Sequence, residues 1–148
     1  MKVEKFGLEQ VLNYRREIEN VRKQDFVSAR SDFEHASDVL SQHQSHADRL
    51  SEEFSTRQSD LRSIEEIRSY SNYFARKREV IRCQREVVDT LGSIMNDRRD
   101  ELLDATKDKK VLESLKEKKA QEFRLEMAQK ERAFLDEISI QRKTAHCE

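Results

Sequence analysis

The chain contains no proline, and apolar residues recur along most of it at alternating spacings of three and four. This pattern is typical of a long helix that packs against another helix. From residue 26 to residue 64 the heptad core positions are Phe26, Ala29, Phe33, Ala36, Leu40, His43, Ala47, Leu50, Phe54, Arg57, Leu61 and Ile64. Only His43 and Arg57 among them are polar, although just 35% of the whole chain is hydrophobic. Such a chain has no place for a catalytic pocket, so its function must be read from the surfaces it offers to other proteins.

The composition suits a thin helical protein. The 148 residues have the length of one domain, 40% of them are charged, and aromatic residues make up 7%. Most side chains of a two-helix object face water, whereas a thick core needs more apolar material. Disorder is the alternative for a chain this polar, but sustained heptads favour helices.

The charges nearly cancel, with 29 Lys and Arg against 30 Asp and Glu. Binding to nucleic acid or to an anionic membrane requires a basic excess, so neither is expected. The segment 107–119 is locally basic. We interpret it as a solvated helix face with charges three and four residues apart, and an acidic protein partner is the alternative.

Other compositional signals point to a soluble, reduced protein. Cys83 and Cys147 lack the spacing of a metal or redox motif. The N-terminal segment has no apolar core of signal-peptide length, and no window has the apolar length of a membrane span. We therefore expect a cytoplasmic protein with no direct membrane insertion.

Two helices are expected, joined by a serine-rich break. The first helix spans about residues 4–57, the turn about 58–62 and the second helix about 63–142, all in one domain over residues 1–148. Ser63 and Glu66 fit a capping box at the start of the second helix. The early core positions of the first helix are expected to be Leu8, Val11, Tyr14 or Arg15, Ile18 and Val21, followed by a one-residue stutter before Phe26.

The second helix has its own series of core positions, and Gly92 lies within it at a cost of about 1 kcal/mol relative to alanine. The series is Ile67, Tyr70, Phe74, Lys77, Ile81, Gln84, Val88, Leu91, Met95, Arg98, Leu102, Ala105, Lys109 and Leu112. Folding the chain back near residues 60–61 pairs core positions whose numbers sum to 120 or 121, and His43 then faces Lys77 in a polar layer. We interpret that layer as a device that fixes the register. The fold class is therefore all-α, a long two-helix antiparallel coiled-coil hairpin with a C-terminal helical overhang; one uninterrupted helix in a parallel dimer is the alternative.

Two apolar surfaces lie outside this pairing. The overhang from about residue 118 carries Ala120, Phe123, Met127, Phe134, Leu135, Ile138 and Ile140. Burying one Phe or Leu is worth about 1.5–3 kcal/mol, so a partner for this set is expected, and fraying of the free tail is the alternative. A second stripe repeats every seven residues at Tyr73, Val80, Val87 and Ile94. It is either a widened core or a docking face for another protein.

No chemical motif is evident. His43 and His46 lie three residues apart without a third metal ligand, and two glycines cannot supply a phosphate loop. We expect a protein that is not an enzyme and that has no cofactor.

Three segments resemble the FliJ family of the flagellar type III export apparatus. The first is the N-terminal segment with Phe6, Leu8, Val11, Leu12 and Arg15. The second is the segment 63–74, in which a tyrosine is followed three residues later by an aromatic residue. The third is the segment 134–140, which combines acidic and aliphatic residues. The resemblance implies a stalk-like protein that inserts into and activates a hexameric export ATPase, links it to the membrane export gate and handles export chaperones at the cytoplasmic face of the inner membrane.

The resemblance also implies site residues. The ATPase interface would comprise Leu8, Val11, Leu12, Arg15, Phe123, Met127, Phe134, Leu135 and Ile138, and the export-gate interface Tyr70, Tyr73, Phe74, Lys77, Val80, Val87 and Ile94. Lys77 departs from the family pattern, in which an aliphatic residue is frequent. The alternatives are a substrate-specific export chaperone, the stalk of a virulence-type secretion system and a structural coiled-coil dimer.

Overall fold

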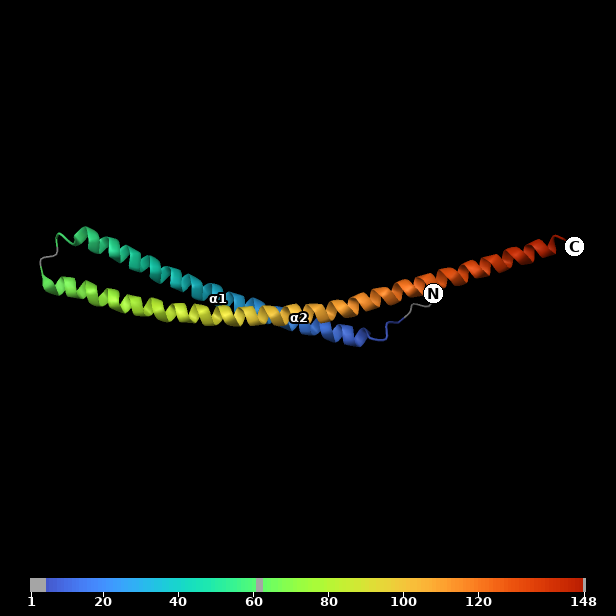
Figure 1. Cartoon of the computed structure of the whole chain (residues 1–148), viewed down its shortest axis with the longest axis horizontal. Coiled ribbons are helices and arrows are strands. Elements are labelled where there is room, and N and C mark those ends of the chain that lie inside the picture. Colours follow the sequence, from blue (N-terminus) through green and yellow to red (C-terminus); the bar gives the residue numbers. More distant parts are fainter. Residues whose placement is uncertain (1–4, 61–62, 148) are drawn as a thin grey trace. The chain divides into compact units, whose positions relative to one another are not determined.

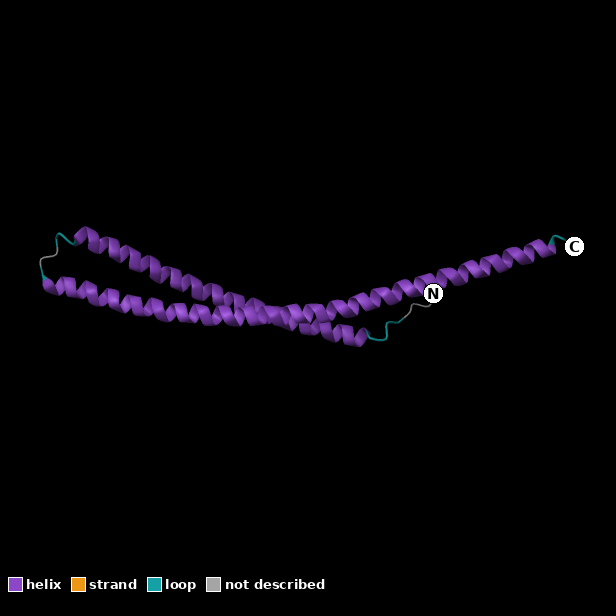
Figure 2. Cartoon of the chain, viewed as in Figure 1, coloured by secondary structure: helices purple, strands orange, loops and turns teal. Residues whose placement is uncertain are grey.

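The computed structural model describes residues 5–60 and 63–147, and 93% of these residues are helical, with no strand among them. Helix α1 spans Glu9–Arg57 and helix α2 spans Ile64–Ala145 (Figures 1 and 2). The two long helices pack against each other, which confirms the all-α helical hairpin. The expected core position Leu61 and part of the expected turn lie outside the described residues.

The helix ends follow from local chemistry. Helix α2 begins where the capping box placed it, and the hydroxyl oxygen of Ser63 accepts a hydrogen bond from the amide of Glu66 at 3.2 Å. Helix α1 begins at Glu9 and not near residue 4. Gly7 is a poor helix former, and the amide of Glu9 closes a turn by donating to the carbonyl oxygen of Phe6 at 3.1 Å. The expected helix start was therefore too early.

The chain divides into two compact units. Unit one combines residues 1–20 with residues 104–148, and unit two comprises residues 21–103. Each unit contains one segment of α1 and one of α2, and each is described below by itself. The expectation of a single domain over residues 1–148 stays a prediction.

Unit two has the antiparallel register that the sequence predicts. All predicted core positions from Phe26 to Phe54 on α1 and from Tyr70 to Arg98 on α2 are buried or half-buried. The side-chain amide of Gln84 donates to the carbonyl oxygen of Ala36 at 2.9 Å, and Lys77 Nζ lies 2.9 Å from His43 Nδ1. Both pairs have residue numbers that sum to 120, so the polar layer exists as expected. Near the turn the core ends, because the predicted core positions Arg57, Ile64 and Ile67 are exposed.

Gly92 lies at a close approach of the two helices in unit two. A Cβ atom on Gly92 would lie 3.2 Å from one carbon of the Phe33 ring and 3.6 Å from another. A side chain here would push the ring by a few tenths of an ångström. The glycine therefore makes room for Phe33, which explains a residue that otherwise weakens the helix.

We predict that Gly92→Ala changes the melting temperature little in the wild-type protein. The gain in helix propensity is about 1 kcal/mol, and crowding of the Phe33 ring offsets it. In a Phe33→Leu background, where the ring is absent, the same substitution should stabilise by close to that full amount. Thermal melts of the four proteins in a double-mutant cycle test this, and equal effects in both backgrounds would contradict it.

The core of unit one differs from the expected one. Leu12 is fully buried and Glu19 is 7% exposed, whereas Leu8, Val11 and Tyr14 are exposed. Leu12, Arg15, Glu19, Arg22 and Phe26 follow one another at spacings of three and four, so the heptad continues without the expected stutter. The expected core positions Val11, Tyr14 and Val21 lie one residue away from this series, and Ile18, also one residue away, is half-buried. Arg15, the alternative to Tyr14, belongs to the series, and Leu8 continues it but is exposed.

Charged core residues explain the error, because each is paired with a charge on α2. In unit one, Lys109 Nζ lies 2.9 and 3.1 Å from the two carboxylate oxygens of Glu19, and Arg15 lies 3.4 Å from Asp108. In unit two, Arg22 lies 3.3 Å from Glu101. A pattern of hydrophobicity passes over such residues and assigns their apolar neighbours to the core.

We predict that Lys109→Met lowers the free energy of unfolding by roughly 2–3 kcal/mol, because the buried Glu19 carboxylate loses the ammonium beside it. The loss should be smaller than for a fully enclosed pair, since the Lys109 side chain keeps 20% of its exposure. Replacing Glu19 and Lys109 together by leucine should recover most of the stability. Urea denaturation followed by circular dichroism measures both effects, with the exposed Lys110→Met as the control. A loss in the control as large as in Lys109→Met would contradict the role of the pair.

Candidate functional site

The titratable groups with displaced pKa values lie in exposed ion pairs. Arg82 pairs with Glu79 and with Glu86, the latter at 2.6 Å, and its hydrogen bond to Glu79 lowers the pKa of that carboxyl group. The same neighbours raise the pKa of Arg82, and the hydroxyl group of Tyr70 is the main cause of the raised pKa of Arg57. No group of metal-binding side chains occurs among residues 5–60 and 63–147. The candidate sites are therefore surfaces.

Neither helix, over its described length, carries an apolar stretch that could cross a membrane.

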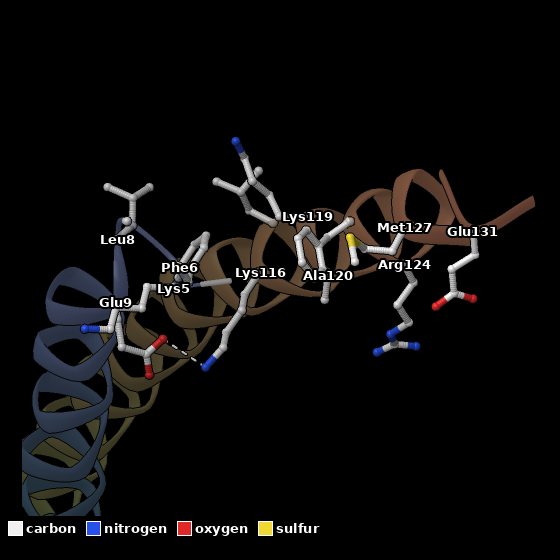
Figure 3. Close-up of a pocket in the computed structure, with 13 residues that line it drawn as sticks. Lys5, Phe6, Leu8, Glu9, Lys116, Lys119, Ala120, Arg124, Met127 and Glu131 are labelled. Atoms are coloured by element: carbon white, nitrogen blue, oxygen red, sulfur yellow. Dashed lines mark ion pairs between the residues drawn. The ribbon is translucent and has the colours of Figure 1, made fainter. Parts of the chain in front are cut away.

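A groove of about 970 Å³ lies in unit one, between the start of the chain and α2 (Figure 3). Phe6, Ala120, Phe123 and Met127 supply apolar surface to it. The rest of its lining consists of Lys5, Gly7, Leu8, Glu9, Leu115, Lys116, Lys119, Arg124 and Glu131. The Glu9 carboxylate lies 2.9 Å from Lys116 Nζ, so an ion pair ties the start of α1 to α2 beside the groove. We call this feature the tail groove.

The floor of the tail groove continues along α2 as one apolar face. At about 100° per residue, Ala120, Phe123, Met127, Phe134 and Ile138 lie within about 60° of arc. We call these five residues the tail face. Phe134 is 62% exposed, and Leu135 beside it is equally exposed. In Figure 1 the end of α2 continues past the start of α1 as a single helix.

The residues predicted for the ATPase interface fall into two groups. Leu8, just before α1, and Val11 on α1 are exposed. On α2 the predicted residues are exposed or half-buried: Phe123, Met127, Phe134, Leu135 and Ile138. Leu12 has no exposed surface, and Arg15 is paired with Asp108. Leu12 is thus a packing residue in this structure, and the surface available to a partner consists of the others.

Sequence reasoning missed the N-terminal wall of the tail groove. Phe6 lines the same groove as Phe123, although the two lie far apart in the sequence. The signal that could have found it is Gly7, which ends the helical pattern and lets the preceding residues leave the helix direction. Arg124 and Glu131 were likewise not singled out, whereas Lys119 belongs to the basic segment 107–119 that the sequence indicated.

The residues predicted for the gate interface also divide into two groups. Tyr73, Val80, Val87 and Ile94 are 39–45% exposed, and we call them the α2 stripe. Tyr70 and Phe74 are half-buried in an aromatic cluster, with ring centroids 5.2 and 5.9 Å from that of Phe54. Lys77 is held by His43. The α2 stripe is therefore accessible surface, and Tyr70, Phe74 and Lys77 belong to the interhelical packing.

We predict that this division appears in stability measurements. Phe74→Ala should cost about 3 kcal/mol, because it removes a ring from the aromatic cluster. Val87→Ser on the α2 stripe should change stability by less than about 0.5 kcal/mol, as for other exposed positions. Urea titrations of the two variants provide the measurement. Equal losses would mean that the α2 stripe is part of the core.

These features define a class: a two-helix coiled-coil protein whose candidate functional sites are exposed apolar surfaces. Residues 4–145 match the family model described as "Flagellar FliJ protein". The chain belongs to this family, and it is thus a component of the type III protein export machinery.

A solved structure has the same fold. The chain is similar to a protein described as a YscO homolog from Chlamydia trachomatis, with a TM-score of 0.64 and 18% sequence identity. The similarity covers 97% of this chain and 98% of the other. No curated protein sequence matched the chain.

Proposed function

We propose that the protein is a non-enzymatic stalk that inserts unit one into the hexameric flagellar export ATPase and activates it. The tail face is the observation that carries this proposal. Met127 and Phe134 are exposed and Ala120, Phe123 and Ile138 are half-buried on one regular apolar face of the helix, and such faces bind in grooves or between helices of a partner. The pore of a ring supplies surrounding walls that could cover the tail face and the exposed Leu8 and Val11 together.

The α2 stripe is the surface we assign to the membrane export gate, with Tyr73, Val80, Val87 and Ile94 as contacts. Its four side chains are exposed on one face of unit two, as a docking surface requires. Export chaperones are further partners in this proposal. The protein then acts at the cytoplasmic face of the inner membrane.

The first test measures stimulation of the cognate ATPase by the purified protein. Replacing Phe123, Phe134 and Leu135 together by serine should reduce the stimulation at least tenfold, because three apolar contacts worth about 1.5–3 kcal/mol each are lost. Helicity should survive, since Phe134 and Leu135 are exposed in the free chain. Circular dichroism checks that condition.

A matched control uses the opposite side of the same helix. Leu125 and Ile140 are as exposed as Phe134 but lie roughly 140–160° from Ala120 at 100° per residue. Leu125→Ser with Ile140→Ser should leave the stimulation unchanged. Full stimulation by the triple variant would remove the tail face from the mechanism. Stoichiometric binding of one secreted substrate without any effect on ATP hydrolysis would favour an export chaperone instead.

A further inference from the structure

In the segment 119–138 of α2, the charges that flank the tail face, read in one direction, are opposite in sign to the same charges read in the other direction. Lys119 and Arg124 flank the tail face in its first half, and Glu131 and Glu137 flank it in its second half. Glu126 and Lys130, which form an ion pair at 3.2 Å within the helix, lie on the same edge as Lys119 and Glu137. At about 100° per residue, Lys119 and Glu137 lie on one side of the face, and Arg124 and Glu131 lie on the other. Lys119, Arg124 and Glu131 also line the tail groove. We propose that the tail faces of two copies of this chain pair antiparallel, as a self-complementary interface.

The apolar residues match in the same alignment. With Phe123 of one copy opposite Phe134 of the other, Ala120 lies one residue from the level of Ile138, and the two-fold axis passes between positions 128 and 129, within two residues of Met127. Small residues then face larger ones at the ends, and each ring packs beside a ring of the other copy. The Phe134 of each copy enters the tail groove of the other, beside Phe6. Because the interface is isologous, every contact occurs twice.

The charges meet in this alignment as well. Lys119 of one copy lies about one residue along the helix from the level of Glu137 of the other, and Arg124 lies about two residues from Glu131, offsets of about 1.5 and 3 Å. In an antiparallel pair the same angular side of each helix faces the same side of the interface. Lys119 therefore meets Glu137, and Arg124 meets Glu131, twice in the dimer. A parallel pair would instead bring like charges to the same level, so the pattern selects the antiparallel arrangement.

The choice of a second copy rests on this complementarity within one sequence. An unrelated partner would need only the apolar face, and nothing would require Lys119 and Arg124 to be matched by Glu137 and Glu131 at the reversed positions. The pairing covers the residues that we assign to the ATPase. In that single respect it rests on the proposed function, because a second copy and the ring would compete for the tail face.

The test uses charge reversal on the full chain and measures mass by sedimentation equilibrium. One variant carries Glu131→Lys and Glu137→Lys, and the other carries Lys119→Glu and Arg124→Glu. The wild-type mass should rise from one chain to two as the concentration increases. Each variant alone places like charges opposite each other, so its dimerisation should weaken at least tenfold. An equimolar mixture should recover wild-type dimerisation, because every pair is then opposite in sign.

Two controls keep the result interpretable. Leu125→Ser leaves the interface side untouched and should dimerise as the wild type does, and circular dichroism should give the same helicity for all variants. A wild-type chain that stays single at its highest soluble concentration overturns the proposal. So does either reversal variant that dimerises as well as the wild type, or a mixture that stays single. Because these measurements contain no ATPase, their outcome is independent of whether the stalk function holds.

Discussion

The packing of α1 against α2 along one continuous heptad is the constraint on which the other features depend. Each helix is too polar to bury more than a narrow line of residues, so the pairing must be aligned along its full length. In unit two the alignment is held by apolar layers and by the His43–Lys77 and Gln84–Ala36 hydrogen bonds. In unit one it is held by ion pairs at core positions, of which Glu19–Lys109 is the most buried. An apolar core would tolerate a shift by one heptad, whereas these polar pairs would lose their partners.

The antiparallel register could be predicted from the sequence because the apolar spacing is regular from Phe26 to Phe54. The register before Phe26 could not be, because Arg15, Glu19 and Arg22 occupy core positions there. A buried charge is acceptable only when an opposite charge lies beside it, and that partner is on the other helix, some ninety residues away in the sequence. The apolar residues Tyr14, Ile18 and Val21 lie one position from these charges, and a reading of hydrophobicity alone prefers them.

Among the candidate surfaces, some could likewise be predicted from the spacing of apolar residues and others could not. The tail face and the α2 stripe follow from periodicity. The α2 stripe is exposed in the structure, and the tail face is exposed at Met127 and Phe134 and half-buried at its other residues. The tail groove does not follow from it, because Phe6 reaches Phe123 only through the turn at Gly7. Among the residues predicted for a partner, Leu12, Tyr70 and Phe74 have the right chemistry, but the helix pairing covers them wholly or in part. Whether an apolar residue at regular spacing is core or surface depends on the angle between it and the partner helix, and that angle is fixed only when the register is known.

The tail face also shows why an exposed apolar surface need not cause indiscriminate aggregation. Leucine or phenylalanine on a helix will pack against almost any apolar surface, so apolar area alone selects no partner. Selection comes from the charges at the edges of the face, which favour some alignments and penalise others. In the proposed pairing, Lys119 and Arg124 before the two-fold position and Glu137 and Glu131 after it would favour an antiparallel copy over a parallel one. A ring partner must satisfy the same pattern, with acidic groups near Lys119 and Arg124 and basic groups near Glu131 and Glu137. The order of charges along α2 would then determine both which surface can cover the tail face and in which direction the helix lies against it.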